Sequence, residues 1–209
     1  MMLLTNMGEF EAFVSLGNML QRPYFAPFIA MDVPAMSLRW RCVCVLLQRE
    51  IPILNAHFIS LQFSIDSCLM NWWKPKTLFT FILHLLTWAI SNRFYTLFVK
   101  DFGINVCTFV WDRFLFEGEV SVYRSCLAAF WCLREHILAE GLQGVSTIIQ
   151  DPSKLVTRAN FEAAYARFSS LDHQVISEAL YQVGLRVFCW NGCFHSNYAN
   201  MLLVKRHFI

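Results

Sequence analysis

The sequence has little charge for a protein of its length. Only 15% of its 209 residues are Asp, Glu, Lys or Arg, and 56% are hydrophobic, whereas an average soluble domain carries about 25% charged residues. Either much of the chain is buried, or something apolar covers it, or some of it is not native domain sequence. The formal net charge is only +2 and the basic residues are scattered, so no nucleic-acid partner is expected.

The sequence also lacks the short motifs that mark hydrolase, metalloprotease and nucleotide sites. It contains no Gly-x-Ser-x-Gly, His-Glu-x-x-His, Gly-x-Gly-x-x-Gly or Gly-x-x-x-x-Gly-Lys-Ser/Thr pattern. Cys189, Cys193 and His195 lie near one another, but their spacing is irregular and lacks the paired ligands of a zinc loop. We therefore expect no catalytic residue, no cofactor and no metal, and the chain itself is not expected to be an enzyme.

The start of the sequence has no secretory pattern, because it carries no basic stretch before an apolar one. Most of the eight cysteines lie in apolar stretches, where a free cysteine behaves as a small hydrophobic residue. We expect reduced cysteines and a cytoplasmic protein.

Strand-like alternation of apolar and polar residues is nearly absent, and apolar residues recur at steps of three and four instead. In residues 9–21 one such face is formed by Phe10, Phe13, Val14, Gly17 and Leu20. The same period predicts helices at about 35–50, 104–116 and 119–139. The predicted fold class is therefore all-α.

Further along the chain, glycines and capping residues mark the expected helix ends. Gly141 and Gly144 are predicted to end the helix that starts near 119. Asn160 and Asp172 are predicted N-caps of two further helices, at 161–170 and 173–187. The tail at 188–209 has no helical stripe and is expected to be unstructured or atypical.

Residues 109–125 read FVWDRFLFEGEVSVYRS and join two apolar helical runs. The residue types place Trp111 in the core and Asp112 near a helix end, where its carboxylate accepts hydrogen bonds. Gly118 suits the position that ends a helix, because glycine adopts backbone conformations that other residues avoid. The stretch is thus interpreted as a scaffold junction.

Residues 77–92 carry no Asp, Glu, Lys or Arg. A membrane-spanning helix needs about 20 apolar residues, so this stretch is a marginal candidate. One alternative is therefore a small helical protein anchored in a membrane through 77–92.

The order of these pieces resembles the C-terminal half of the TBC domain, the Rab GTPase-activating fold. In that family an aromatic-rich stretch leads to a Trp-Asp pair, an acidic glycine turn and a helix that opens with an aromatic-Arg pair. Residues 94–125 follow this order, and residues 9–36 and 49–72 resemble the helices upstream. The positions that match the family motif are Trp111, Asp112, Gly118, Glu119, Tyr123 and Arg124.

Two departures from the family pattern affect the expected function. The family accelerates GTP hydrolysis with an Arg from an Ile-x-x-Asp-x-x-Arg motif and a Gln from a Tyr-x-Gln motif, and this sequence contains neither. The resemblance also stops after Trp72 and resumes at Arg93. We therefore expect a partial TBC domain at 1–187, interrupted by a non-family insertion at 73–92.

The resemblance implies a Rab-type small GTPase as partner and a role in regulating small GTPases in vesicle traffic. Without the two fingers, a truncated and GAP-deficient form is expected. A non-catalytic Rab-binding adaptor is the other alternative. The expected location is cytoplasmic, with peripheral contact on endomembranes if there is any membrane contact.

Overall fold

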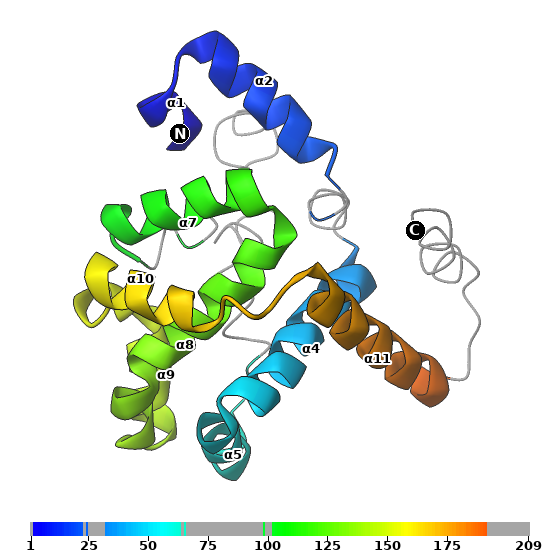
Figure 1. Cartoon of the computed structure of the whole chain (residues 1–209). Coiled ribbons are helices and arrows are strands. Elements are labelled where there is room, and N and C mark those ends of the chain that lie inside the picture. The colour runs from blue at the N-terminus through cyan, green and yellow to red at the C-terminus, as the bar shows by residue number, and fades with distance from the viewer. Residues whose placement is uncertain are drawn as a thin grey trace, which may run out of the picture.

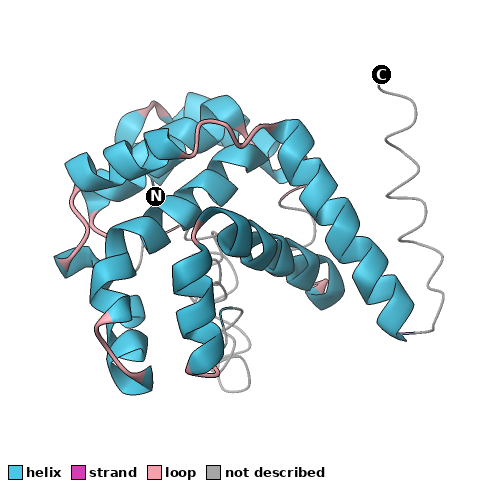
Figure 2. Cartoon of the chain, turned by 60° about the horizontal axis from the view of Figure 1, so that its bottom comes forward, coloured by secondary structure: helices cyan, strands magenta, loops and turns pink. Residues whose placement is uncertain are grey.

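The computed structural model describes residues 2–22, 24, 32–63, 65, 98 and 102–191. These residues form helices joined by turns and loops, without a strand among them (Figure 2). The all-α prediction is confirmed. The uncharged stretch 77–92 and the tail from 192 onward lie outside the described residues.

The helices follow one another along the chain as shown in Figure 1. They are α1 (Met2–Asn6), α2 (Glu9–Leu20), α4 (Val33–Glu50), α5 (Pro52–Ser60), α7 (Ile104–Glu117), α8 (Glu119–Leu138), α9 (Leu142–Gln150), the short 3-10 helix η2 (Pro152–Lys154), α10 (Arg158–Arg167) and α11 (His173–Asn191).

The centre of the fold is α8, which packs against α4, α5, α7, α9 and α10. Its residues 120–130 are all buried except Arg124, as expected of a helix that is surrounded on every side. Aromatic rings fill the space around it. Phe130 of α8 contacts Phe58 of α5 edge to face, with ring centroids 5.8 Å apart. The core therefore forms around one helix, and the outer helices are positioned by their contacts with it.

The second layer is built by α4, α10 and α11. The N-cap of α4 is Asp32, whose Oδ1 accepts a hydrogen bond from the Ala35 N–H at 3.1 Å. One side of α4 packs on α8, and α11 packs against α4 as well. The helix α10 lies across both α7 and α8. The α7–α8 pair is thus held between α4 and α10.

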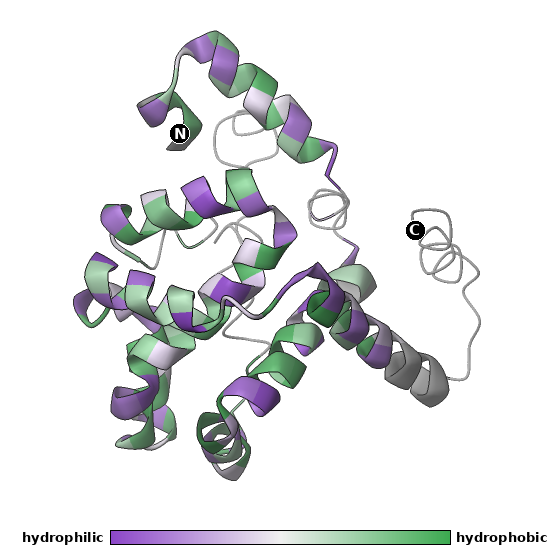
Figure 3. Ribbon diagram, in the orientation of Figure 1, coloured by the Kyte–Doolittle hydropathy of each residue, from purple (hydrophilic) through white to green (hydrophobic). Residues whose placement is uncertain are grey.

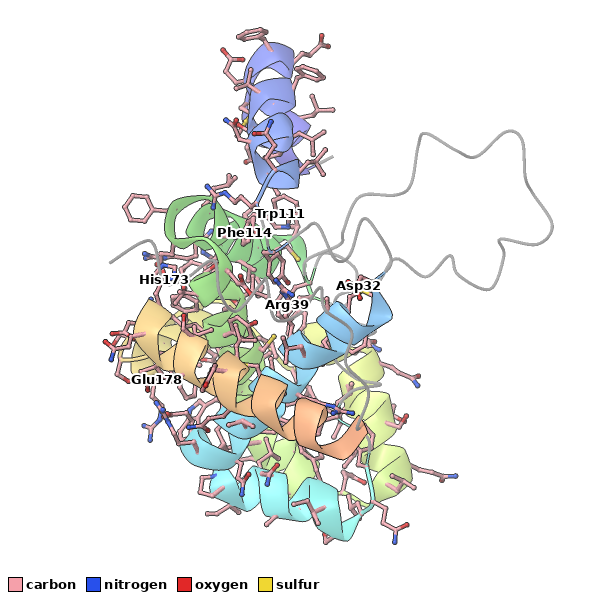
Figure 4. The ribbon with its side chains drawn as sticks, turned by 90° about the vertical axis from the view of Figure 1, so that its right-hand side faces the viewer. Asp32, Arg39, Trp111, Phe114, His173 and Glu178 are labelled. Atoms are coloured by element: carbon pink, nitrogen blue, oxygen red, sulfur yellow. The ribbon has the colours of Figure 1, made fainter. Side chains whose placement is uncertain are left out.

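The second helix, α2, projects from the body (Figures 1 and 4), and several of its large apolar side chains are exposed. The predicted helix is confirmed, but Phe10 and Phe13 are 75% and 73% exposed, and Ala12 and Met19 are the buried residues. Figure 3 shows several apolar residues along this projecting helix. Periodicity correctly grouped these side chains on one face, but nothing described packs over Phe10 and Phe13.

The helix that starts at Glu119 ends at Leu138, before Gly141, as predicted, but the roles predicted for Gly144 and Asn160 were wrong. Gly144 lies inside α9, because burial of Val145 and Ile149 outweighs the roughly 1 kcal/mol that a glycine costs in a helix. Thr157, not Asn160, caps α10, and its hydroxyl oxygen accepts the Asn160 N–H at 3.3 Å. An upstream Thr in an extended conformation is therefore the cap, and Asn160 belongs to the first turn.

The last described helix has the predicted start and a later end. Asp172 Oδ1 accepts the Val175 N–H at 2.9 Å, which confirms the predicted cap. The helix continues to Asn191 instead of ending at 187.

No single helix in the described part of the chain is long and apolar enough to cross a membrane. Leu38–Glu50 of α4 and Pro52–Ser60 of α5 pass that test only when they are taken together, and the pair is bent by 117°.

Candidate functional site: the junction of α7 and α8

The junction turns at Gly118, which both ends α7 and begins α8. Its backbone has φ 72° and ψ −144°, a region that is almost closed to residues with a Cβ atom. The Gly118 N–H donates to the Phe114 carbonyl at 2.9 Å, and its own carbonyl accepts the Ser121 hydroxyl at 2.7 Å. One glycine therefore sets the direction in which α8 leaves α7.

Glu119, the first residue of α8, links this turn to α4. Its Oε1 lies 3.3 Å from Nε of Arg39 and accepts the Tyr123 hydroxyl at 3.0 Å. The Arg39 side chain is only 5% exposed, and its guanidinium also faces the Tyr24 ring. A carboxylate in the first turn of a helix is stabilised by the helix dipole, and here it also neutralises a buried cation.

Glu117, the last residue of α7, gathers three partners. Its carboxylate accepts Nη1 of Arg124 at 2.7 Å and the Tyr165 hydroxyl of α10 at 2.7 Å. Arg113, one turn earlier on α7, lies 3.2 Å from the other oxygen. This carboxylate therefore ties α7, α8 and α10 together.

Arg124 extends the same network to the loop between α10 and α11. Its Nε donates to the Leu171 carbonyl and its Nη2 to the Ser169 carbonyl, both at 2.9 Å. With Nη1 on Glu117, the planar guanidinium uses three of its five N–H groups in one geometry, which Lys could not reproduce. The side chain is only 15% exposed, so the bonds to Glu117 and Leu171 are partly shielded from water, whereas the bond to Ser169 lies at the surface.

The Cys42 thiol and the Tyr123 and Tyr165 phenols beside the junction are held in their neutral forms. Burial, followed by the negative charge of Glu119, raises the pKa of the Cys42 thiol from 9.0 to about 12. The same two causes raise the pKa of the buried Tyr123 phenol well above 10.0. Burial and the hydrogen bond to Glu117 likewise raise the pKa of Tyr165. None of these groups supplies a thiolate or phenolate nucleophile at neutral pH.

The side chains of this arrangement bind one another and hold helices together. Glu117 and Glu119 are paired with arginines, the Tyr123 and Tyr165 hydroxyls are hydrogen-bonded, and the Cys42 thiol keeps its proton at neutral pH. The part of the chain that the structure describes also holds no group of three or more His, Cys, Asp or Glu residues able to bind a metal ion. The junction is a rigid scaffold that fixes the relative positions of four helices and a loop.

The structure brings together four of the six residues predicted from the family motif: Gly118, Glu119, Tyr123 and Arg124. The other two do not join them. Trp111 is half-buried and packs against the core from the side of α7, and its buried Nε1 finds no hydrogen-bond partner among the residues that the structure describes. Asp112 is exposed in the middle of α7. The expectation that Asp112 lies near a helix end was wrong, because α7 continues for five more residues beyond it, to Glu117.

Sequence reasoning missed Arg39, Glu117 and Tyr165. Glu117 stands in the acidic turn that the sequence displayed, and its separation of seven residues from Arg124 hinted at a pair across the turn. Arg39 and Tyr165 come from helices 80 and 48 residues away from their partners Glu119 and Glu117. No local signal marks contacts of that kind. Cys193 and His195 lie outside the described residues, and Cys189 lies in α11.

We expect the protein to lose stability in alkaline solution. An unfolded chain releases the Cys42 proton near pH 9, whereas the folded chain keeps it to about pH 12. The protonated Cys42 thiol therefore stabilises the folded state over the unfolded one. This stabilisation is complete below pH 9 and is lost as the pH rises towards 12. Urea midpoints followed by tryptophan fluorescence should therefore fall between pH 7.5 and pH 10.5, and Cys42→Ala should flatten that fall. An unchanged midpoint would contradict the proposed linkage.

Comparison with known protein families gives a match that includes the α7–α8 junction. The model of the Rab-GTPase-TBC domain matches residues 1–138, which include α7, the junction and all of α8. The match therefore includes α8 and its neighbours α4, α5 and α7, while α9 and α10, which also pack on α8, lie beyond it.

Relatives match at low identity over a similar length. The chain is 28% identical over 127 residues to Drainin of Dictyostelium discoideum, covering 61% of this chain and 24% of Drainin. It is 24% identical over 125 residues to TBC1 domain family member 12 of Xenopus tropicalis, and 23% identical to human TBC1 domain family member 14. Each of these two matches covers 60% of this chain and 15% of the relative.

The chain thus spans a quarter or less of the length of these relatives. No solved structure gives a significant match.

Proposed function

The chain belongs to the Rab-GTPase-TBC domain family, and from that premise we propose that it binds a Rab-type small GTPase without accelerating GTP hydrolysis by itself. Proteins of this family are GTPase activators, which regulate an enzyme that is not part of their own chain. The proposal thus keeps a Rab-type small GTPase as the partner. It treats binding of that GTPase and acceleration of its GTP hydrolysis as two separate properties.

The observation that carries the proposal is the α7–α8 junction. The family motif residues Gly118, Glu119, Tyr123 and Arg124 are engaged in holding helices together, so they serve as scaffold. Activation in trans requires an Arg that stabilises the transferring phosphate and a Gln that orients water. Such an Arg is worth about 10³–10⁵ in rate. The motifs that carry these fingers, Asp-x-x-Arg and Tyr-x-Gln, are absent from the sequence.

The exposed face of α2 supports the idea that these helices belong to a larger array. Large apolar side chains such as Phe10 and Phe13 are mostly exposed, and contiguous apolar surface on a domain commonly marks a place where another part of a protein packs. A longer TBC domain would offer such a part. In this proposal the residues that complete the catalytic surface come from outside the described helices.

We predict that the purified chain leaves GTP hydrolysis at the intrinsic rate across a panel of Rab GTPases. Phosphate release from each GTP-loaded Rab would be measured with and without the chain, and a complete TBC protein would serve as the positive control. Acceleration of any Rab well above its intrinsic rate would contradict the lack of activation.

Binding is measured separately, by capture of GTP-loaded and GDP-loaded Rabs on the immobilised chain. Capture of a GTP-loaded Rab without acceleration is the result expected of a non-catalytic Rab-binding adaptor. If no Rab is captured, the binding half of the proposal fails. The variant Arg124→Met serves as a control for scaffold integrity, because it disrupts the junction while leaving the exposed surface of α2 unchanged.

The proposed location follows from the proposed partner. We place the chain in the cytoplasm, in peripheral contact with endomembranes that carry its GTPase. The alternative of a membrane anchor rests on residues 77–92, which lie outside the described part of the chain.

A further inference from the structure

Trp131 on α8 lies between two arginines at the surface where α8 meets α10. The guanidinium carbon of Arg134 is 3.8 Å from the centre of the indole ring, and that of Arg167 is 4.0 Å away. Two guanidinium groups cannot share one face of a ring at such distances without overlapping, so they cover opposite faces. The indole itself is anchored by edge-to-face contact with the buried Phe168.

The hydrogen-bonding capacity of this stack is largely unused. Within the described residues Arg167 contacts no carboxylate. Arg134 donates only to Glu135 at 2.9 Å, and the Glu135 side chain is 79% exposed. Cation–π stacking does not occupy the N–H groups at the edge of a guanidinium. Both cations therefore have donors free for an external acceptor.

The stack also orders these side chains before any ligand arrives. A free surface Arg loses rotamer entropy when it binds, whereas one already held against a ring loses less. Trp and Arg are also the residue types that dominate binding energy at protein interfaces. This region is thus better prepared for binding than Arg49 and Arg158, which are paired with acids, because Arg134 and Arg167 are also held against the Trp131 ring.

We propose that Arg134, Trp131 and Arg167 form a binding site for an acidic peptide segment of a partner protein. The two cations are separated by the ring between them, roughly 8 Å, and side chains on one face of an extended peptide repeat about every 7 Å. Two carboxylates at alternate positions of a strand can therefore each meet one guanidinium. A single phosphate is too small to engage both.

Glu135 competes for this site in the free protein. It is an exposed acid beside Arg134, and an exposed ion pair is worth about 0–1 kcal/mol. A peptide carboxylate would displace it. None of its residues belongs to the α7–α8 junction, so substitutions here leave that scaffold in place.

The test measures binding of a fluorescent peptide that alternates Glu and Thr to the full chain, at low salt and at physiological salt. The matching peptide with Gln in place of Glu is the negative probe. We expect Arg167→Gln and Arg134→Gln each to weaken binding about tenfold or more. Glu135→Gln, a surface change that leaves the fold intact, should strengthen binding about twofold to fivefold.

Arg49→Gln is the matched control, because it removes an exposed arginine from α4 and should leave affinity unchanged. Thermal unfolding of each variant shows whether the fold is retained. The proposal is overturned if the Gln peptide binds as well as the Glu peptide, or if Arg49→Gln weakens binding as much as Arg167→Gln. It is also overturned if Glu135→Gln has no effect, or if a single-stranded oligonucleotide of equal charge competes as well as the peptide.

Discussion

Replacing Arg124 with methionine is expected to lower the free energy of unfolding by about 3 kcal/mol. The change keeps an unbranched apolar stem but removes the guanidinium and with it all three hydrogen bonds, to Glu117, Ser169 and Leu171. Glu117 keeps its bonds to Arg113 and Tyr165 but loses its closest cation. The effect lies at the low end of the range for breaking a buried pair, because Arg124 and Glu117 are 15% and 18% exposed and water partly screens them.

Urea unfolding at equilibrium measures this loss. The matched control is Arg158→Met, which breaks an exposed pair with Glu162 one turn along the same helix and should cost less than about 0.5 kcal/mol. Arg124→Lys should recover only part of the loss, since an ammonium group cannot reach three acceptors in the same plane. If Arg124→Met were no more destabilising than Arg158→Met, the hydrogen bonds of Arg124 would not hold the helices of the junction together as described above.

Gly118→Ala is the second large effect, with an expected loss of about 1–3 kcal/mol. The backbone conformation at Gly118 is unfavourable for any residue with a Cβ atom. In addition, a Cβ atom there would lie 3.3 Å from Nη1 of Arg22. Arg22 stacks over Phe114 at the base of α2, so the substitution should disturb both the turn and the attachment of α2.

The control for Gly118 is Gly103, the residue that precedes α7. It has φ −62° and ψ 151°, and a Cβ atom there meets nothing within 4 Å. Gly103→Ala should therefore change the free energy of unfolding by less than about 0.5 kcal/mol. Equal losses for the two glycines, measured by the same urea titration, would show that the backbone angle at Gly118 is not what matters.

The helices themselves were largely predictable from the sequence. The apolar period and the glycine between two runs located α7 and α8 to within one or two residues, because both signals are local. Asp172 was recognised as a cap for the same reason. The errors at Gly144 and Asn160 arose where burial of nearby residues, or an extended Thr one turn upstream, outweighed the local preference.

The surroundings of each helix were not predictable in the same way. Periodicity shows which side chains of α2 share a face, but it contains no information about what packs against that face, so Phe10 looked like a core residue and is exposed. Glu119 and Arg124 of the motif both lie at the junction. Arg39, which pairs with Glu119, and Tyr165, which binds Glu117, come from distant helices, and only the three-dimensional arrangement of α4 and α10 reveals them.

The two carbonyl bonds of Arg124 also bear on the order in which the fold assembles. Their acceptors lie 45 and 47 residues further along the chain, whereas the contacts that close the turn at Gly118 span four residues or fewer. Local contacts form with little loss of chain entropy, and distant ones must wait until the intervening segment has folded back. The α7–α8 hairpin can therefore form early, while Arg124 reaches its carbonyls only after α9 and α10 are in place. In this protein the Arg124 guanidinium therefore forms its bonds to the Leu171 and Ser169 carbonyls late in folding, once the helices around it have assembled.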